Sequence, residues 1–244
     1  MKISNLCRIE LYRFWHSMSI IKYIFIIPLI LFFMSYINIA DMENEITEKL
    51  VWASMAPDFS YLIVFICAVI AVYVGREFRQ RTINYEIMRG YNFCQIAWSK
   101  TITCGILISG IIVICMMAYL SIFTAVKCDD CVIRIFCIFI LFFHICSSAT
   151  LYILLFRNPV AGGVVAFFRF MVFESILQII VSALPIDGIE MLITKSMIFN
   201  QWIKLISIEE TLNMEYIRLI IVAALIEYVV LQSILRLSSE VIDI

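Results

Sequence analysis

Six long apolar runs restrict the fold of this chain more than any other feature of its sequence. They cover roughly residues 20–40, 59–75, 101–126, 135–156, 160–184 and 216–235. A helix needs about 20 apolar residues to cross the ~30 Å hydrocarbon core of a bilayer, and each run approaches that length. Strands with open edges leave backbone groups without partners in lipid. We therefore expect one all-α transmembrane domain over residues 1–244, with six spans.

The composition agrees with this expectation. The chain is 64% hydrophobic and 15% charged, whereas soluble domains are about 45–50% apolar and ~25% charged. The first run begins only after Lys22 and no small-residue cleavage pattern follows it, so we expect a retained span rather than a signal peptide. The net charge of −1 gives no indication of nucleic-acid binding.

The cysteines do not predict a metal site or a redox centre. Only Cys128 and Cys131 have a C-x-x-C spacing, and Asp129 and Asp130 are the only further ligands beside them. A tetrahedral metal site in a protein normally has four cysteine or histidine ligands, and this segment offers only two cysteines. Five of the other cysteines lie inside apolar runs, where a thiol behaves as a small hydrophobe: Cys67, Cys104, Cys115, Cys137 and Cys146. We expect no metal, no cofactor and no catalytic residue.

The distribution of basic residues predicts the orientation. With the N-terminus inside, eleven lysines and arginines fall in cytosolic segments and six in outer segments. Lysine and arginine in short loops favour the cytosolic side. We therefore predict a multi-pass protein of the plasma membrane with both termini in the cytoplasm.

The segment before the first span, residues 3–18, is amphipathic at the helical period. One face is expected to carry Ile3, Cys7, Leu11, Phe14 and Met18, and the opposite face Asn5, Arg8, Tyr12 and His16. Only Glu10 interrupts the apolar face. We predict an interfacial helix; the alternative is a plain basic leader that sets the topology.

The second cytosolic segment, residues 76–100, is longer than a turn requires. It alternates charged residues with Phe78, Ile83, Ile87 and Met88, which predicts a short helix, and Gly90 is a plausible end for it. Such a helix at the mouth of a bundle suits docking of a cytosolic partner. The side chains expected to make that contact are Glu77, Arg79, Arg81, Glu86 and Arg89.

The order of these features is similar to that of a known family. A basic amphipathic leader and a first span precede a second span ending in Gly-Arg-Glu-Phe at residues 75–78. Thr-Ile, a glycine and Ser-Lys then lead into the third span. This pattern resembles the permease subunits of the type-2 family of ATP-binding-cassette (ABC) exporters, matching at Glu77, Thr82, Gly90 and Lys100. Arg81 stands where that family commonly has glycine, and Phe93 where an arginine often precedes the lysine.

The resemblance implies an ATP-driven exporter. Its permease would form a homodimer or heterodimer on two separate ABC ATPase subunits. The ATPase must be another polypeptide, because this sequence contains no Gly-Lys dipeptide and therefore no phosphate loop ending in Gly-Lys-Ser/Thr. Peptides, antibiotics and lipids all remain possible cargo.

The outer segment 185–215 is too apolar for a free linker. Its large side chains, such as Phe199, Trp202 and Leu205, predict one or two short helices before the sixth span. The resemblance implies a re-entrant pair. A helix lying on the outer surface is the alternative.

Intramembrane charges suggest a polar centre. Arg169 and Glu227 are predicted to lie at similar depths in the fifth and sixth spans, so we expect them to form a pair. Neutralising either residue should damage folding or export, and exchanging the two should partly restore it. Glu174, about 140° from Arg169 on an α-helix, is poorly placed to join it. The alternative function is a secondary carrier or membrane sensor built around Arg169, Glu174 and Glu227. The Glu209-Glu210 pair lacks the nearby histidines of an intramembrane protease.

Overall fold

The computed structural model describes residues 3–40, 47–122, 131–183, 196–207 and 214–240, and all regular elements in these ranges are helices. The long ones are α2 (Met18–Ala40), α4 (Asp58–Arg79), α6 (Phe93–Ile122), α7 (Cys131–Phe156) and α12 (Met214–Glu240). The short ones are α1 (Ile3–His16), α3 (Glu48–Ser54), α5 (Thr82–Met88), α8 (Pro159–Phe168), η1 (Arg169–Phe173), α9 (Glu174–Ala183) and α11 (Ile198–Ile206).

Within the described residues, five helical segments are long and apolar enough to cross a membrane: Asp58–Arg79, Phe93–Ile122, Cys131–Phe156, Pro159–Ile180 and Tyr216–Leu237. The chain is therefore an all-helical, multi-pass membrane protein. Helices α1 and α2 form a pair bent by 68°, which counts as one further candidate crossing.

The helix that contains the third predicted span extends beyond that span at its N-terminal end. Helix α6 starts at Phe93 rather than at residue 101, so most of segment 76–100 is helical and only short turns flank α5. The sequence placed the span start at the first uncharged stretch. Lys100 lies inside the helix, because its charge is paired with Glu10 and Glu77. Residues 123–126 and 184, expected at span ends, lie outside the described residues.

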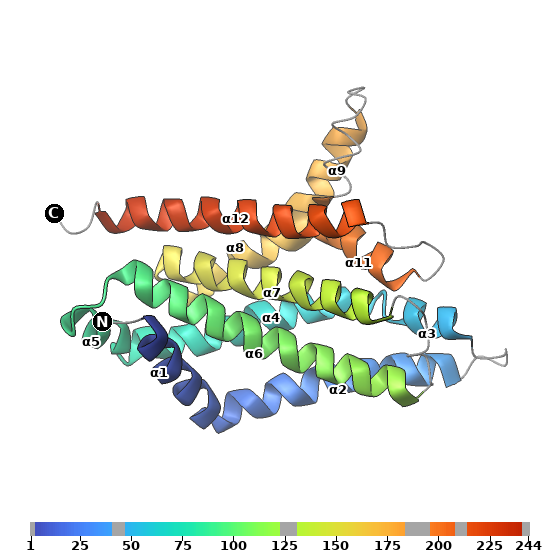
Figure 1. Cartoon of the computed structure of the whole chain (residues 1–244), viewed down its shortest axis with the longest axis horizontal. Coiled ribbons are helices and arrows are strands. Elements are labelled where there is room, and N and C mark those ends of the chain that lie inside the picture. The colour runs from blue at the N-terminus through green and yellow to red at the C-terminus, as the bar shows by residue number, and fades with distance from the viewer. Residues whose placement is uncertain (1–2, 41–46, 123–130, 184–195, 208–213, 241–244) are drawn as a thin grey trace.

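Helix α7 is the centre of the bundle. It contacts α4, α6, α8, α11 and α12, and most of its side chains are buried. Figure 1 shows α2, α4, α6, α7 and α12 running side by side along the long axis, with α9 projecting from the bundle. The outer faces of α9 and α12 carry many exposed apolar side chains, as expected of helices that face lipid.

The turn between α7 and α8 is fixed by local sequence signals. The Asn158 side chain accepts hydrogen bonds from the backbone N–H groups of Val160 and Ala161, and Pro159 occupies the first turn of α8. A Cβ on Gly162 would lie 2.4 Å from the Cα atom of Ile153. Glycine at this position therefore allows α8 to pack directly on the backbone of α7.

Helix α11 is part of the core. Trp202 is fully buried and stacks on Phe59 at 4.9 Å between ring centroids. Arg134 on α7 donates hydrogen bonds to the carbonyl oxygens of Leu205 and Ser207, both at 2.9 Å, and so satisfies the C-terminal end of α11. The remainder of the outer segment, residues 185–195 and 208–213, lies outside the described residues. So do Cys128, Asp129 and Asp130.

Candidate functional site

A buried cluster of charged side chains joins four helices at the end of the bundle that carries α5. Lys100 of α6 is fully buried, and its Nζ donates to Glu10 Oε1 of α1 at 2.6 Å. The same ammonium group also pairs with Glu77 at the end of α4. The Tyr73 hydroxyl donates to the other oxygen of Glu10 at 3.0 Å.

Arg13 is the second cation of this cluster. Its guanidinium donates to Glu10 Oε1 at 3.2 Å, pairs with Glu86 of α5, and lies 4.0 Å from Glu77 Oε1. Burial alone would lower the pKa of Arg13, but the hydrogen bond and negative charge of Glu86, with Glu10 and Glu77, raise it. Arg13 therefore remains charged and links α1 to both α4 and α5.

The cluster places three buried carboxylates around two cations, of which Lys100 is fully buried and Arg13 is 29% exposed. An isolated buried charge is very costly, and a pair offsets that cost only in a well-defined geometry. The positions of α1, α4, α5 and α6 are consequently interdependent at this end of the bundle. A displacement of α5 would move Glu86, and through Arg13 it would act on α1.

Two of the five residues expected to contact a partner are not on the surface. Glu77 and Glu86 are buried in the cluster, whereas Arg79, Arg81 and Arg89 are exposed. The sequence pattern of alternating charges did not separate these two groups, because burial here depends on cations supplied by other helices.

The buried face of α1 also differs from the predicted one. Leu6, Glu10 and Phe14 are buried, whereas Ile3 and Leu11 are exposed. Glu10 is thus the centre of the packed face rather than an interruption of an apolar one. Its partner Lys100 lies 90 residues away, so periodicity within the helix could not identify this role.

Helix α5 presents an exposed surface that combines apolar and basic groups. Tyr85, Ile87 and Met88 are exposed, Met88 to 82%, and Arg81 and Arg89 flank the helix. Gly90 follows with a φ of 85°, in agreement with the predicted end of the helix. Arg81 has a φ of 54°, in the left-handed region that glycine favours. We call the exposed residues 79, 81, 85 and 87–89 the α5 surface.

A second charged network lies between α7, η1 and α12. The structure brings Arg169 and Glu227 together, with Nη2 to Oε2 at 3.0 Å. Glu227 Oε2 is also 3.1 Å from His144 Nε2, and Arg169 Nη1 is 3.1 Å from Glu174 Oε1. The other oxygen of Glu174 accepts from the backbone N–H of Phe199 on α11 at 3.4 Å.

The contact between Arg169 and Glu174 corrects the helical-wheel expectation. Residues 169–173 form a π-helix, in which hydrogen bonds join residues five apart. Side chains at i and i+5 then lie on nearly the same face, so Glu174 reaches Arg169. The angle of about 140° holds only for a regular α-helix. His144 was not predicted to take part either, because nothing in its apolar run indicates a partner on α12.

The charged networks contain no group of three or more histidine, cysteine, aspartate or glutamate side chains able to hold a metal ion, as far as the described residues extend. Both networks instead pair acids with bases, which suits them to fixing helix positions. Comparisons with protein-family models, with curated proteins and with solved structures find no match to this chain.

Proposed function

We propose that this chain is the membrane-spanning permease of an ABC exporter, driven by ATP that a separate subunit hydrolyses. The observation that carries the proposal is the buried cluster of Glu10, Arg13, Glu77, Glu86 and Lys100. It fixes α5 against α1, α4 and α6 and leaves the α5 surface facing outward. Two residues of the sequence resemblance, Glu77 and Lys100, form the core of this cluster.

The α5 surface has the properties of a docking site for a soluble protein. Large apolar side chains exposed beside basic ones are typical of interaction surfaces. Arg81 has a left-handed backbone conformation that glycine favours, and the resembled family commonly has glycine at this position. The proposed partner binds here through Arg79, Arg81, Arg89, Tyr85 and Met88, and its movement reaches α1 through Glu86 and Arg13.

In this proposal the chain has six spans, α2 being the first, and acts without chemistry of its own in the plasma membrane. The excess of lysine and arginine at the α5 end supports a cytoplasmic location for that end and for both termini. Helix α11 belongs to a re-entrant segment before the sixth span, which its buried Trp202 supports. Two copies of the permease, identical or different, would complete the exporter.

Copurification with the ABC protein encoded by a neighbouring gene tests the proposal. Reversing the three exposed arginines (Arg79→Glu, Arg81→Glu, Arg89→Glu) should abolish binding of that subunit and ATP-dependent transport in liposomes. Arg218→Glu, an exposed arginine at the opposite end, is the matched control and should bind normally. Binding that survives the triple reversal, or a wild-type chain that binds no ABC subunit, would contradict the proposal.

The partly buried network around Arg169 favours a second candidate, a secondary carrier. Ionisable groups inside membranes often mark ion or substrate paths, and π-helical turns occur frequently at functional sites. A carrier would transport its substrate in liposomes without ATP, driven by an ion gradient, and would lose that transport in Glu227→Gln. An absolute requirement for ATP and the ABC subunit would exclude this candidate.

A further inference from the structure

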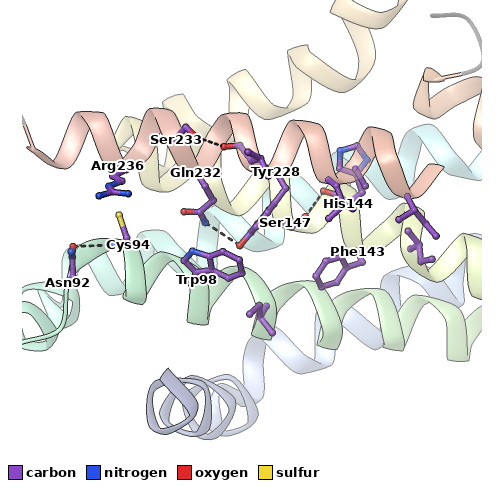
Figure 2. A pocket seen from close by; sticks show the side chains of 16 residues that line it. Asn92, Cys94, Trp98, Phe143, His144, Ser147, Tyr228, Gln232, Ser233 and Arg236 are labelled. Carbon is purple, nitrogen blue, oxygen red and sulfur yellow. Dashed lines mark hydrogen bonds between the residues drawn. The ribbon is translucent and has the colours of Figure 1, made fainter. Parts of the chain in front are cut away.

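A groove of about 950 Å³ lies between α6, α7 and α12. Figure 2 shows Asn92, Cys94 and Arg236 near one end of this groove and Phe143 and His144 near the other. Its volume is at the upper end of the ~300–1,000 Å³ found for ligand sites. The end with Asn92 and Arg236, which we call the mouth, is on the α5 side of the bundle, where α6 begins and α12 ends (Figure 1).

The groove opens sideways. Trp98 of α6 and Leu225 and Val229 of α12 line it, and their side chains are 41%, 56% and 60% exposed. All three belong to helices long and apolar enough to cross a membrane, so we place the open side of the groove toward lipid. A ligand would therefore enter from within one leaflet.

The inner half of the groove offers an apolar surface although it contains His144 and Ser147. The Ser147 hydroxyl donates to the backbone oxygen of His144, and His144 Nε2 is engaged by Glu227. With these polar atoms satisfied within the protein, the surface available to a ligand comes mainly from Ile102, Phe143 and Leu225. Such a surface suits a hydrocarbon chain.

The mouth has the opposite character. Asn92, Gln232, Ser233 and Arg236 line it, and none of the described residues that line the groove is acidic. Arg157 lies close to α6 as well, with its guanidinium over the Phe93 ring at 5.4 Å. The mouth thus offers a guanidinium together with amide and hydroxyl groups, where α6 begins and α12 ends.

We infer that this groove binds an anionic phospholipid, with its phosphate at Arg236 and an acyl chain along Trp98 and Phe143 toward His144. A guanidinium supplies several donors for phosphate oxygens, and basic pockets between spans recognise anionic headgroups in this way. The inference does not depend on the proposed function, because it requires only that α6, α7 and α12 lie in a membrane.

Fluorescence quenching by brominated lipids tests the site, because Trp98 lines the groove. Trp52 and Trp202 are fully buried, so Trp15→Phe leaves Trp98 as the exposed indole. The protein is placed in phosphatidylcholine nanodiscs that contain a minor fraction of brominated phosphatidylglycerol or brominated phosphatidylcholine. We expect an apparent preference of about fivefold for phosphatidylglycerol, the effect of one basic residue on an anionic lipid.

Two variants and a control make the result specific. Arg236→Gln should remove the preference, and Ala224→Phe should reduce it by filling the groove without changing the charge. Arg79→Gln removes the same charge at the same end but outside the groove, and should keep the preference. Equal quenching by both lipids in the parent would overturn the inference. So would equal loss in Arg236→Gln and Arg79→Gln, or absence of quenching by either lipid, which would mean that another chain covers the groove.

Discussion

Replacing Lys100 with methionine tests whether the buried cluster holds α1, α4, α5 and α6 together at the α5 end of the bundle. The substitution keeps the length of the side chain but removes the cation that pairs with Glu10 and Glu77. Glu10 retains Arg13 at 3.2 Å, whereas the nearest remaining cation to Glu77 is Arg13 at 4.0 Å. Breaking a buried pair typically costs ~3–5 kcal/mol, and the remaining contacts of Arg13 favour the lower value.

A loss of about 3 kcal/mol lowers the melting temperature by roughly 6–12 °C, since 1 kcal/mol corresponds to ~2–4 °C in a chain of this size. Thermal unfolding of the purified protein in detergent, followed by intrinsic fluorescence, measures the change. The double variant Glu77→Gln/Lys100→Met removes the orphaned charge together with its partner. It should recover most of the lost stability.

Arg89→Gln provides the control, because this exposed side chain should contribute no more than ~0.5 kcal/mol. The reasoning fails if Lys100→Met melts at the wild-type temperature, or if the double variant is less stable than the single one. Either result would mean that the charges of the cluster do not determine the packing of these helices.

Three further predictions concern the intramembrane charges and the helix packing. Arg169→Gln should destabilise the protein more than Glu174→Gln, because it leaves the carboxylates of both Glu174 and Glu227 without their cation; equal melting temperatures would contradict this. Exchanging Arg169 and Glu227 should restore little of the stability lost in the single variants, since the exchange puts a carboxylate beside Glu174 and a cation beside His144. Gly162→Ala should cost ~1–3 kcal/mol by overpacking against the Ile153 backbone. Gly110→Ala, where no atom lies within 4 Å, should be neutral or stabilising by up to ~1 kcal/mol; similar effects of the two would refute the packing explanation.

Much of the fold follows from patterns that act over short distances along the chain. The apolar runs predict the long helices, the charge alternation predicts α5, and Gly90 predicts its end. Counting residues from the span ends also predicts comparable depths for Arg169 and Glu227, which are in contact. Each of these inferences needs only residues close in sequence or a fixed rise per residue.

The features that escaped prediction depend on contacts between distant helices or on irregular backbone. Glu10 is buried because Lys100 on another helix neutralises it. Glu174 reaches Arg169 because five residues form a π-helix, for which the local sequence gives no signal. In the sequence Arg134 resembles an ordinary charge of an outer loop. In the structure it donates hydrogen bonds to the carbonyl groups at the C-terminal end of α11, a helix distant in sequence.

The separation of Glu10 and Lys100 has a consequence for biosynthesis. At ~5–20 residues per second, the 90 residues between them take roughly 5–18 s to translate. Helix α1 is therefore made long before Lys100, and we expect it to lie at the membrane surface until then, with Arg13 as the cation nearest to Glu10. Its exposed Ile3, Leu11 and Trp15 can hold it there against lipid during that time. Helix α1 thus reaches its final position only after α6 has been made, although it precedes α6 by two long helices, α2 and α4.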